Sequence, residues 1–432
     1  MAVPVVEQGY AAESVMSAVW WSNLDAEQTP ELRWPLSIPV YEAMHEQESQ
    51  VASVLRAVTL PIRRTGYRID GTGCDPRVTD LVSVDIGLPV AGQDQGLEAR
   101  RRTRDRFSFH DHWRLALLEL RYGHSFFEQL YRPEGSLYRL RKLAWRPPRT
   151  ITKIDVARDG GLVAIHQADA RIGVERLVAY VNEREGANWI GRSLLRSGYK
   201  YWLLKDQMLR VGAQTVKRNG MGVPIYTGAN IDSEGLSPDQ YREAQEADLA
   251  AGLEIAAGFR SGDNAGAAIA NGAQLRLTGV EGRLPDALPW VKYYDTQIAR
   301  AALAHFLNLG GDDTTGSYAL GDTFAEFFGQ SLQTVAQQVA DVFNQHVIED
   351  LVDVNFGPDE PAPRLVFDEI GAKHPATAEA IRALVDCGVL TPDEPLETHI
   401  RTAYSLPAAD PATAAAAGPP AAPPVPEENI DV

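Results

Sequence analysis

The sequence predicts an α+β protein that is mainly helical. Three long segments carry apolar residues at spacings of three and four, the pattern of an amphipathic helix with one buried face. Short alternating segments between residues 137 and 180 predict a small sheet. With 44% hydrophobic and 23% charged residues among 432, the composition is that of a folded globular protein.

The chain is expected to begin with an extended arm, because residues 1–40 show no sustained periodicity. From Ile38 an apolar stripe predicts a helix that Pro61 stops, and a strand follows at 67–69. Residues 70–104, rich in Gly, Asp and Arg, are assigned no element.

A second amphipathic helix is predicted within residues 107–131, broken at Gly123 and followed by a strand. The longest helix of this half is predicted over 193–219, with Gly220 as its C-cap. The first half of the chain therefore mixes helices and strands.

A small β-α-β insert is predicted next. It has strands at 223–226 and 274–278, and Ser237-Pro238-Asp239-Gln240 reads as a capping box that opens a helix to about Ala251. A second long helix is expected from Pro289 to the glycines at 310 and 311.

The sequence GGDDTTGSYALGD, residues 310–322, predicts an unusually long loop between helices. A third long helix is predicted over 323–352 and a strand over 364–368, followed by a helical pair at 377–390 and 395–404. The last 27 residues include seven prolines and nine alanines and are predicted to be disordered.

The net charge of −17 is placed unevenly. Residues 311–432 carry 21 acidic and 4 basic side chains, so the first 310 residues sum to zero. An acidic balance disfavours a protein that grips nucleic acid, because such affinity comes mostly from phosphate neutralisation. An acidic balance is compatible with a protein past which DNA slides without sticking, because acidic side chains repel the phosphates.

Several other classes are disfavoured. No run of about 18 apolar residues occurs and the start lacks the order of a signal peptide, so a cytosolic protein without membrane contact is expected. Cys74 and Cys387 lack zinc or disulfide spacing and are interpreted as buried thiols.

No catalytic motif for nucleotide, ester or metalloprotease chemistry is present, and neither enzyme activity nor a cofactor is expected. The histidines at 110, 112 and 124 lack metal-ligand spacing, and Asp312 beside Asp313 lacks the spacing of a Mg²⁺ site.

A set of basic side chains accompanies the long helix at 193–219. It can be a solvated face, or a surface that meets phosphates or acidic residues of a neighbour, and both interpretations stay open. Its members are Arg192, Arg196, Lys200, Lys205 and Arg210.

Four stretches, taken in order, resemble the portal proteins of tailed bacteriophages, most closely the Mu-like branch. They are a helix leading into a strand at 41–69, a helix with a Tyr-Gly break at 108–131, a Gly-x-Ser-Leu opening, long helix and Gly-Met-Gly-x-Pro ending at 191–224, and a returning helix, loop and long helix at 285–330.

The resemblance implies a portal fold with a wing, a two-helix stem, an α/β clip and a C-terminal crown region, assembled as a ring. The implied parts are an arm (1–40), wing (41–192), stem helix (193–219), clip (220–283), second stem helix (284–309), tunnel loop (310–322), long wing helix (323–350), C-terminal wing and crown (351–405) and tail (406–432).

It further implies a virion protein at one capsid vertex, assembled in the host cytoplasm as a ring of about twelve copies. Double-stranded DNA would pass through it without sequence specificity during packaging and ejection. The implied partners are the major capsid protein, the large terminase subunit and the head-completion or adaptor proteins of the head–tail connector.

By the same resemblance the tunnel loop lines the channel. Its acidic side chains would hold phosphates off the wall, and its glycines would let it adapt to the duplex. The channel-lining candidates are Asp312, Asp313, Thr314, Thr315, Ser317, Tyr318 and Asp322. Two alternatives stay open: a metal-dependent DNA-processing enzyme built on those aspartates, and a minor head or scaffold protein without a channel.

Overall fold

The computed structural model describes residues 27–92, 107–221, 223–258, 268–278, 286–302 and 318–370, with a few single positions beyond them. The chain divides into two units after Gly371, and the helices and strands of these ranges belong to the first unit. No helix in the described ranges is long and apolar enough to cross a membrane.

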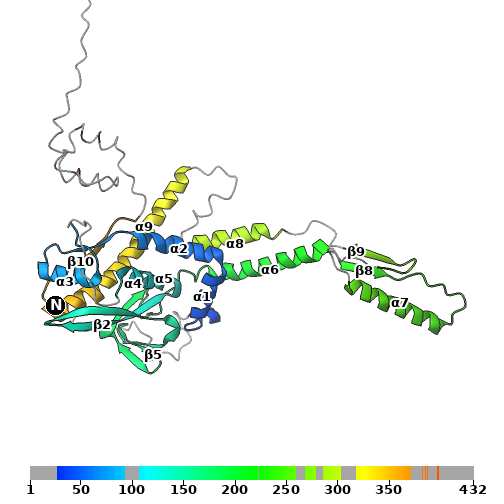
Figure 1. The fold of residues 1–432 in the computed structure, drawn as a ribbon, viewed down its shortest axis with the longest axis horizontal. Coiled ribbons are helices and arrows are strands. Elements are labelled where there is room, and N and C mark those ends of the chain that lie inside the picture. Colours follow the sequence, from blue (N-terminus) through cyan, green and yellow to red (C-terminus); the bar gives the residue numbers. More distant parts are fainter. Residues whose placement is uncertain are drawn as a thin grey trace, which may run out of the picture. The chain divides into compact units, whose positions relative to one another are not determined.

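Helices and strands alternate through the first half, and long helices dominate the second (Figure 1). The helices are α1 (Ser37–Gln47), α2 (Ser49–Arg64), α3 (Pro76–Ile86), α4 (Phe109–Ala116), α5 (Glu119–Tyr122), α6 (Tyr199–Met221), α7 (Pro238–Gly258), α8 (Leu288–Ala301), α9 (Tyr318–Phe343) and α10 (Glu349–Phe356). A π-helical turn, Asn344–Ile348, joins α9 to α10. Single 3-10 turns lie at Pro30–Leu32, Pro148–Thr150 and Val174–Arg176.

The strands form small antiparallel sheets. The order β3-β2-β7 makes one sheet and β4-β5-β6 another, while β1 pairs with β10 and β8 with β9. Their bounds are β1 Tyr67–Asp70, β2 His124–Glu134, β3 Leu137–Arg146, β4 Ile151–Val156, β5 Leu162–Gln167, β6 Ala170–Gly173, β7 Leu177–Val181, β8 Val223–Thr227, β9 Gln274–Thr278 and β10 Arg364–Phe367.

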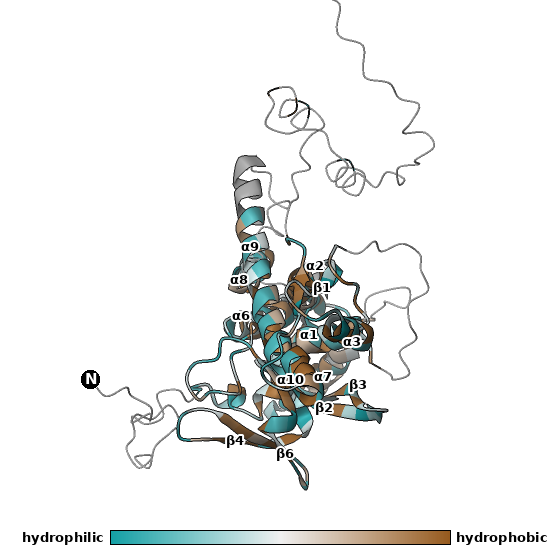
Figure 2. Cartoon of the chain, turned by 90° about the vertical axis from the view of Figure 1, so that its left-hand side faces the viewer, coloured by the Kyte–Doolittle hydropathy of each residue, from teal (hydrophilic) through white to brown (hydrophobic). Residues whose placement is uncertain are grey.

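The main core lies where α2, α4 and α9 meet β1, β2 and β7. Trp113 of α4 stacks on Phe109 and donates a 2.8 Å hydrogen bond from its indole N–H to the Tyr67 hydroxyl. Tyr67 in turn donates to the carbonyl of Ile62, 2.8 Å away. Figure 2 shows hydrophobic stretches along β2 and β4, and alternating hydrophilic and hydrophobic turns along α9, as expected for one buried face.

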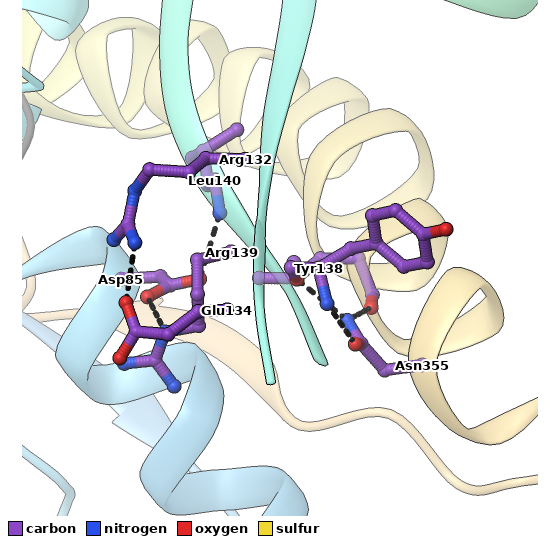
Figure 3. Close-up of polar contacts among 8 residues, drawn as sticks. Asp85, Arg132, Glu134, Tyr138, Arg139, Leu140 and Asn355 are labelled. Carbon is purple, nitrogen blue, oxygen red and sulfur yellow. Dashed lines mark hydrogen bonds and ion pairs between the residues drawn. The ribbon is translucent and has the colours of Figure 1, made fainter. Parts of the chain in front are cut away.

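Polar contacts fix the β2–β3 hairpin between α3 and α10 (Figure 3). Asp85 of α3 pairs with Arg139, with 2.9 Å between Oδ1 and Nε, and accepts a hydrogen bond from the backbone N–H of Leu140 at 2.8 Å. From the other side, Asn355 of α10 accepts from the Tyr138 N–H at 2.7 Å and donates to its carbonyl at 2.9 Å.

Two sequence predictions in this half were wrong. The helix does not stop at Pro61, because α2 continues to Arg64 and buries Ile62 completely. Residues 76–86, assigned no element, form α3. Asp75 caps this helix by accepting from the Arg77 N–H at 2.8 Å, and Gly87 ends it in the left-handed region, with φ of 77°.

The long helix α6 begins at Tyr199 instead of residue 193 and continues past Gly220 to Met221, so Gly220 is not its C-cap. The capping box is confirmed: the Gln240 N–H donates to Ser237 Oγ at 3.3 Å, and the Ser237 N–H donates to Gln240 Oε1 at 2.9 Å. However, α7 runs on to Gly258, beyond the predicted Ala251.

Three further helix predictions differ from the structure. The single helix predicted from Ile38 is two helices, because the chain is extended at Glu48 between α1 and α2. The helix predicted from Pro289 to residue 310 ends at Ala301, and the helix predicted from residue 323 begins at Tyr318. The strands that became β1, β2, β8, β9 and β10 and the small sheets between 137 and 181 lie close to their predicted bounds. The helical pair at 377–404 and the tail at 406–432 lie outside the described ranges, as do residues 1–26.

Candidate functional site

Helices α6 and α8 run side by side and form the structural centre of the candidate site (Figure 1). Gly212 permits their close approach, because a Cβ there would lie 3.1 Å from the Cβ of Ala287. Nearer the sheets, Tyr201 and Tyr294 face one another with 6.5 Å between ring centroids. We call this arrangement the α6–α8 pair.

A buried lysine anchors the α6–α8 pair to α2. Lys205 Nζ lies 2.7 Å from Glu48 Oε1 and 2.6 Å from Asp295 Oδ1, and only 6% of the lysine is exposed. Burial alone would lower the pKa of Lys205, but the hydrogen bonds and charges of Asp295 and Glu48 outweigh it and raise that pKa. The ammonium therefore stays charged and holds three helices together.

Two glycines meet where the segment before α6 crosses the end of α5. Gly123 and Gly191 have φ values of 92° and 67°, and a Cβ on Gly191 would lie 2.2 Å from the Gly123 carbonyl oxygen. Next to them, Ser193 Oγ donates to the Arg121 carbonyl at 2.6 Å. The Tyr-Gly break and the Gly-x-Ser-Leu opening, distant in sequence, thus meet in one backbone crossing.

Three buried titratable groups lie on α4, α5 and β7. His112 Nε2 is 2.8 Å from the Tyr180 hydroxyl, and burial lowers the pKa of His112 to about 3. Burial also raises the pKa of Glu119 to about 8, so this carboxyl is protonated at neutral pH. All three side chains are at least nine-tenths buried, which makes them core groups out of reach of a substrate.

The predicted basic set does not form one surface. Lys205 is buried, so its inclusion in an exposed stripe is corrected. Arg192 pairs with Glu185 at 3.0 Å and Arg196 with Glu27 at 2.5 Å, both before α6 begins. The exposed members on α6 are Lys200, which lies over the Tyr201 ring, and Arg210, which pairs with Asp206 at 2.7 Å.

The tunnel-loop candidates fall mostly outside the described residues. Asp312, Asp313, Thr314, Thr315 and Ser317 belong to that group. The predicted loop was wrong in its last part, because α9 begins at Tyr318 and includes Asp322. The side chains of these two residues are not described.

Metal and thiol candidates gain no support as sites. Among the described residues no group of three or more metal-ligating side chains occurs. His124 is buried beside the Ile190 carbonyl, 2.9 Å from it. The prediction of buried thiols was wrong, since Cys74 is half-buried and Cys387 exposed.

The insert after α6 is a hairpin covered by one helix. Strands β8 and β9 pair antiparallel, and the Tyr226 ring packs on Gly252 of α7, where a Cβ would lie 1.9 Å from the ring. The Tyr226 hydroxyl donates to Asp248 at 2.9 Å. Helix α7 carries five acidic residues and one basic residue and exposes Leu249 and Leu253.

Sequence reasoning missed the partners that give the α6–α8 pair its anchorage. Glu48 and Asp295 lie 157 and 90 residues from Lys205 along the chain, so spacing within α6 carries no trace of them. A usable signal was present in Gly123 and Gly191, because isolated glycines beside regular elements often mark close backbone approach.

Comparison with solved structures shows a shared fold. A chain in the virion of the native gene transfer agent (GTA) particle is 14% identical, with 87% of this chain and 94% of that chain covered and a TM-score of 0.52. A chain in the neck of the native GTA particle, computed with C12 symmetry, is 13% identical over 85% and 93%, with a TM-score of 0.50. An HK97 family phage portal protein from Corynebacterium diphtheriae is 16% identical over 81% and 98%, with a TM-score of 0.39.

The family model described as the portal protein of Mu bacteriophage matches residues 38–406. This range includes every helix and strand from α2 to β10, the glycine crossing, the lysine anchor and the acidic insert. The chain therefore belongs to the family of Mu bacteriophage portal proteins.

Proposed function

We propose that this portal protein assembles into a ring of about twelve copies and conducts double-stranded DNA at one vertex of a phage capsid. The C12 symmetry of the GTA neck, which contains a chain of similar fold, supports the copy number. The role is structural, and the chain works in the virion after assembly in the host cytoplasm.

The observation that carries this proposal is the exposed apolar surface of the α6–α8 pair. On α6 the spacing of Leu209, Ala213 and Val216 forms an apolar flank, and 72% of Val216 is exposed. On α8 the residues Leu288 and Trp290 are more than half exposed. Large apolar side chains left exposed on both helices favour a protein–protein interface there.

A neighbouring copy explains this flank best. Burying a leucine or valine side chain is favourable by roughly 1.5–3 kcal/mol of free energy. Because every copy carries the flank, each contact between neighbouring subunits in a ring would be stabilised in this way. A closed ring uses the two sides of each subunit once each and leaves no flank uncovered.

The parts of the ring follow from the family architecture. We assign the α6–α8 pair to the stem, the β8-α7-β9 insert to the clip, residues 310–317 to the tunnel loop that leads into α9, and residues 351–405 to the C-terminal wing and crown. The exposed acidic surface of α7 supports docking of the large terminase subunit and later of adaptor proteins at the clip. The capsid protein would contact the wing.

The tunnel loop supplies a second test of the channel. Reversing Asp312, Asp313 and Asp322 to lysine should slow DNA translocation, because phosphates would bind the wall, and the effect should be larger at low salt. Packaging rates measured at two ionic strengths check this. Equal rates for the wild type and the variant would refute the tunnel-loop role.

Electron microscopy of the purified full-length chain tests the ring itself. We expect annular particles with a central hole wide enough for a duplex. Monomers or open filaments at all concentrations would contradict the proposal. The double variant Leu209→Gln, Val216→Gln should weaken ring formation, whereas Leu249→Gln on α7 should leave it intact.

A further inference from the structure

Three basic side chains gather where α1, α2 and α5 meet: His45, Arg56 and Arg121. Burial lowers the pKa of His45, and the charges of Arg121 and Arg56 lower it further, which indicates that the three groups lie close together. The carboxylate of Glu46 opposes them. We call these four residues the His45–Arg121 cluster. Its two arginines leave it positively charged in a chain whose balance is −17.

Arg121 is buried without a hydrogen-bond acceptor. Its Nε and Nη2 groups are both buried, and no described residue offers either of them an acceptor within hydrogen-bond distance. The carboxylate of Glu46 remains 4.0 Å from Nη2, and 72% of the Glu46 side chain is exposed. Nδ1 of His45 is also buried and has no hydrogen-bond partner among the described residues. The cluster therefore holds buried nitrogen atoms that are ready to accept a further partner.

Two other well-buried arginines show what Arg121 lacks. Arg139 binds Asp85, with 2.9 Å between Nε and Oδ1, and Arg146 binds Glu128. The Arg121 side chain is more buried than either, with 13% exposed against 18% and 22%. Arginine stays protonated in proteins, and a buried charge without hydrogen bonds is strongly unfavourable. A carboxylate from outside the subunit would remove this unfavourable contribution.

The cluster lies beside the proposed contact between copies. His45 is three residues before Glu48, which binds Lys205 and so anchors the α6–α8 pair. Figure 1 shows α1 next to the beginning of α6. The cluster also opens to the surface, because Glu46 and Arg56 are exposed. A second copy of the chain is rich in carboxylates, since the sequence has 58 acidic and 41 basic residues.

We propose that the His45–Arg121 cluster binds a carboxylate side chain of the neighbouring copy in the ring. This inference rests on the proposed function and adds a polar site to the apolar flank. A carboxylate accepts from two N–H groups of one guanidinium, so Nε and Nη2 of Arg121 match its two oxygens. His45 is neutral at pH 7, because its pKa is lowered, and its ring N–H can donate to the same carboxylate. Glu46, exposed and 4.0 Å from Nη2, marks the side from which the carboxylate approaches.

Zero-length cross-linking of the full-length chain tests which copy supplies the carboxylate. Arg121→Lys replaces the guanidinium by an amine, which a carbodiimide couples to a carboxylate in contact with it. Rings are assembled from equal amounts of unlabelled and isotope-labelled chains, so that a cross-link between copies can join a light peptide to a heavy one. The matched control is Arg114→Lys, at an exposed position that binds Asp111 of its own chain at 2.9 Å. Arg56→Lys repeats the test from the exposed part of the cluster if Arg121→Lys misfolds.

We expect position 121 to give light–heavy cross-links to an acidic residue, and position 114 to give cross-links within one chain only. Mass spectrometry of the joined peptides then identifies the acidic residue. Coupling of position 121 only to Glu46 or to another residue of its own chain would overturn the inference, and so would the absence of coupling in assembled rings. Microscopy before cross-linking shows whether rings exist, so failure of the proposed function is recognised separately.

The variant Arg121→Gln separates ring assembly from the stability of the subunit. The concentration at which half of the chains are assembled should rise at least about tenfold, because losing one partner of a buried charge pair weakens an interface strongly. Separate subunits, obtained by dilution, should be no less stable to heat than the wild type, because they no longer bury an unpaired guanidinium. Arg114→Gln should leave assembly unchanged. Lower subunit stability with unchanged assembly would show that a partner within the subunit satisfies Arg121, and would overturn the inference.

Discussion

Replacing Lys205 by methionine should open the α6–α8 pair. The substitution keeps most of the side chain's length and removes the ammonium between the carboxylates of Glu48 and Asp295, whose side-chain exposures are 10% and 27%. Removing one partner of a buried ion pair costs about 3–5 kcal/mol. Because Asp295 keeps some contact with water, we expect the lower end, about 3 kcal/mol or roughly a hundredfold in an opening equilibrium.

Hydrogen exchange at the amides of α6 around position 205 measures this opening directly. The matched control is Lys200→Met, which removes the same charge five residues earlier from an exposed position and should change the free energy of opening by less than about 0.5 kcal/mol. Adding Glu48→Gln and Asp295→Asn to the Lys205→Met variant should restore part of the protection, because the cost comes from uncompensated charge. Equal exchange in Lys205→Met and Lys200→Met would refute the anchor.

The pKa of Lys205 fixes the pH range in which the anchor acts. Because that pKa is raised in the folded state, the stabilisation is complete below the ordinary lysine value of 10.5 and is lost as pH rises through the higher folded value. Lys205 therefore stays charged around neutral pH, and its titration should not change the free energy of opening of α6 in that range. Hydrogen exchange at α6, corrected for intrinsic rates, checks this.

The remaining predictions concern the glycine crossing, the buried carboxyl and the insert. Glu119→Gln should flatten the pH dependence of thermal stability, because the raised pKa makes wild-type stability fall between about pH 4.5 and 8; identical profiles would contradict this. Gly191→Ala should lower the free energy of unfolding by more than about 1 kcal/mol, because of backbone strain and the clash with the Gly123 carbonyl. In the same thermal assay Gly198→Ala should be tolerated, because the nearest atom to its Cβ would be 3.5 Å away. Ser237→Ala should destabilise the first turn of α7 by about 1 kcal/mol, because the side-chain cap is lost. Amide hydrogen exchange should become faster in that turn and stay unchanged in α9.

Helices and strands with a strong local pattern were predictable from the sequence. Strand β9 was predicted with its observed bounds, and the capping box at Ser237 marked the start of α7, because turn and cap chemistry is local. Helix α3 was missed although its signals were present: Asp75 before it, Pro76 at its first position and Gly87 after it. The surrounding glycine and arginine residues obscured a short apolar stripe.

Long-range packing explains the other differences. Pro61 costs α2 a backbone hydrogen bond, yet Ile62 is fully buried and holds the last turn in place. Residues 193–198 follow a helical pattern, but Ser193 is engaged by the Arg121 carbonyl, and α6 starts only after that contact. The spacing along α6 predicted Lys205 in a basic stripe, whereas in the structure it is buried and paired with the distant Glu48 and Asp295. The partners of Ser193 and Lys205 lie 72 or more residues away along the chain, so the local pattern gives no sign of them.

The proposed function requires copies of this chain to close around a duplex. Electron microscopy of the full-length protein incubated with linear double-stranded DNA tests it most directly. We predict closed rings with density for a single duplex through the hole. Subunits that stay separate at every concentration, or closed rings whose hole is too narrow for a duplex, would contradict the account.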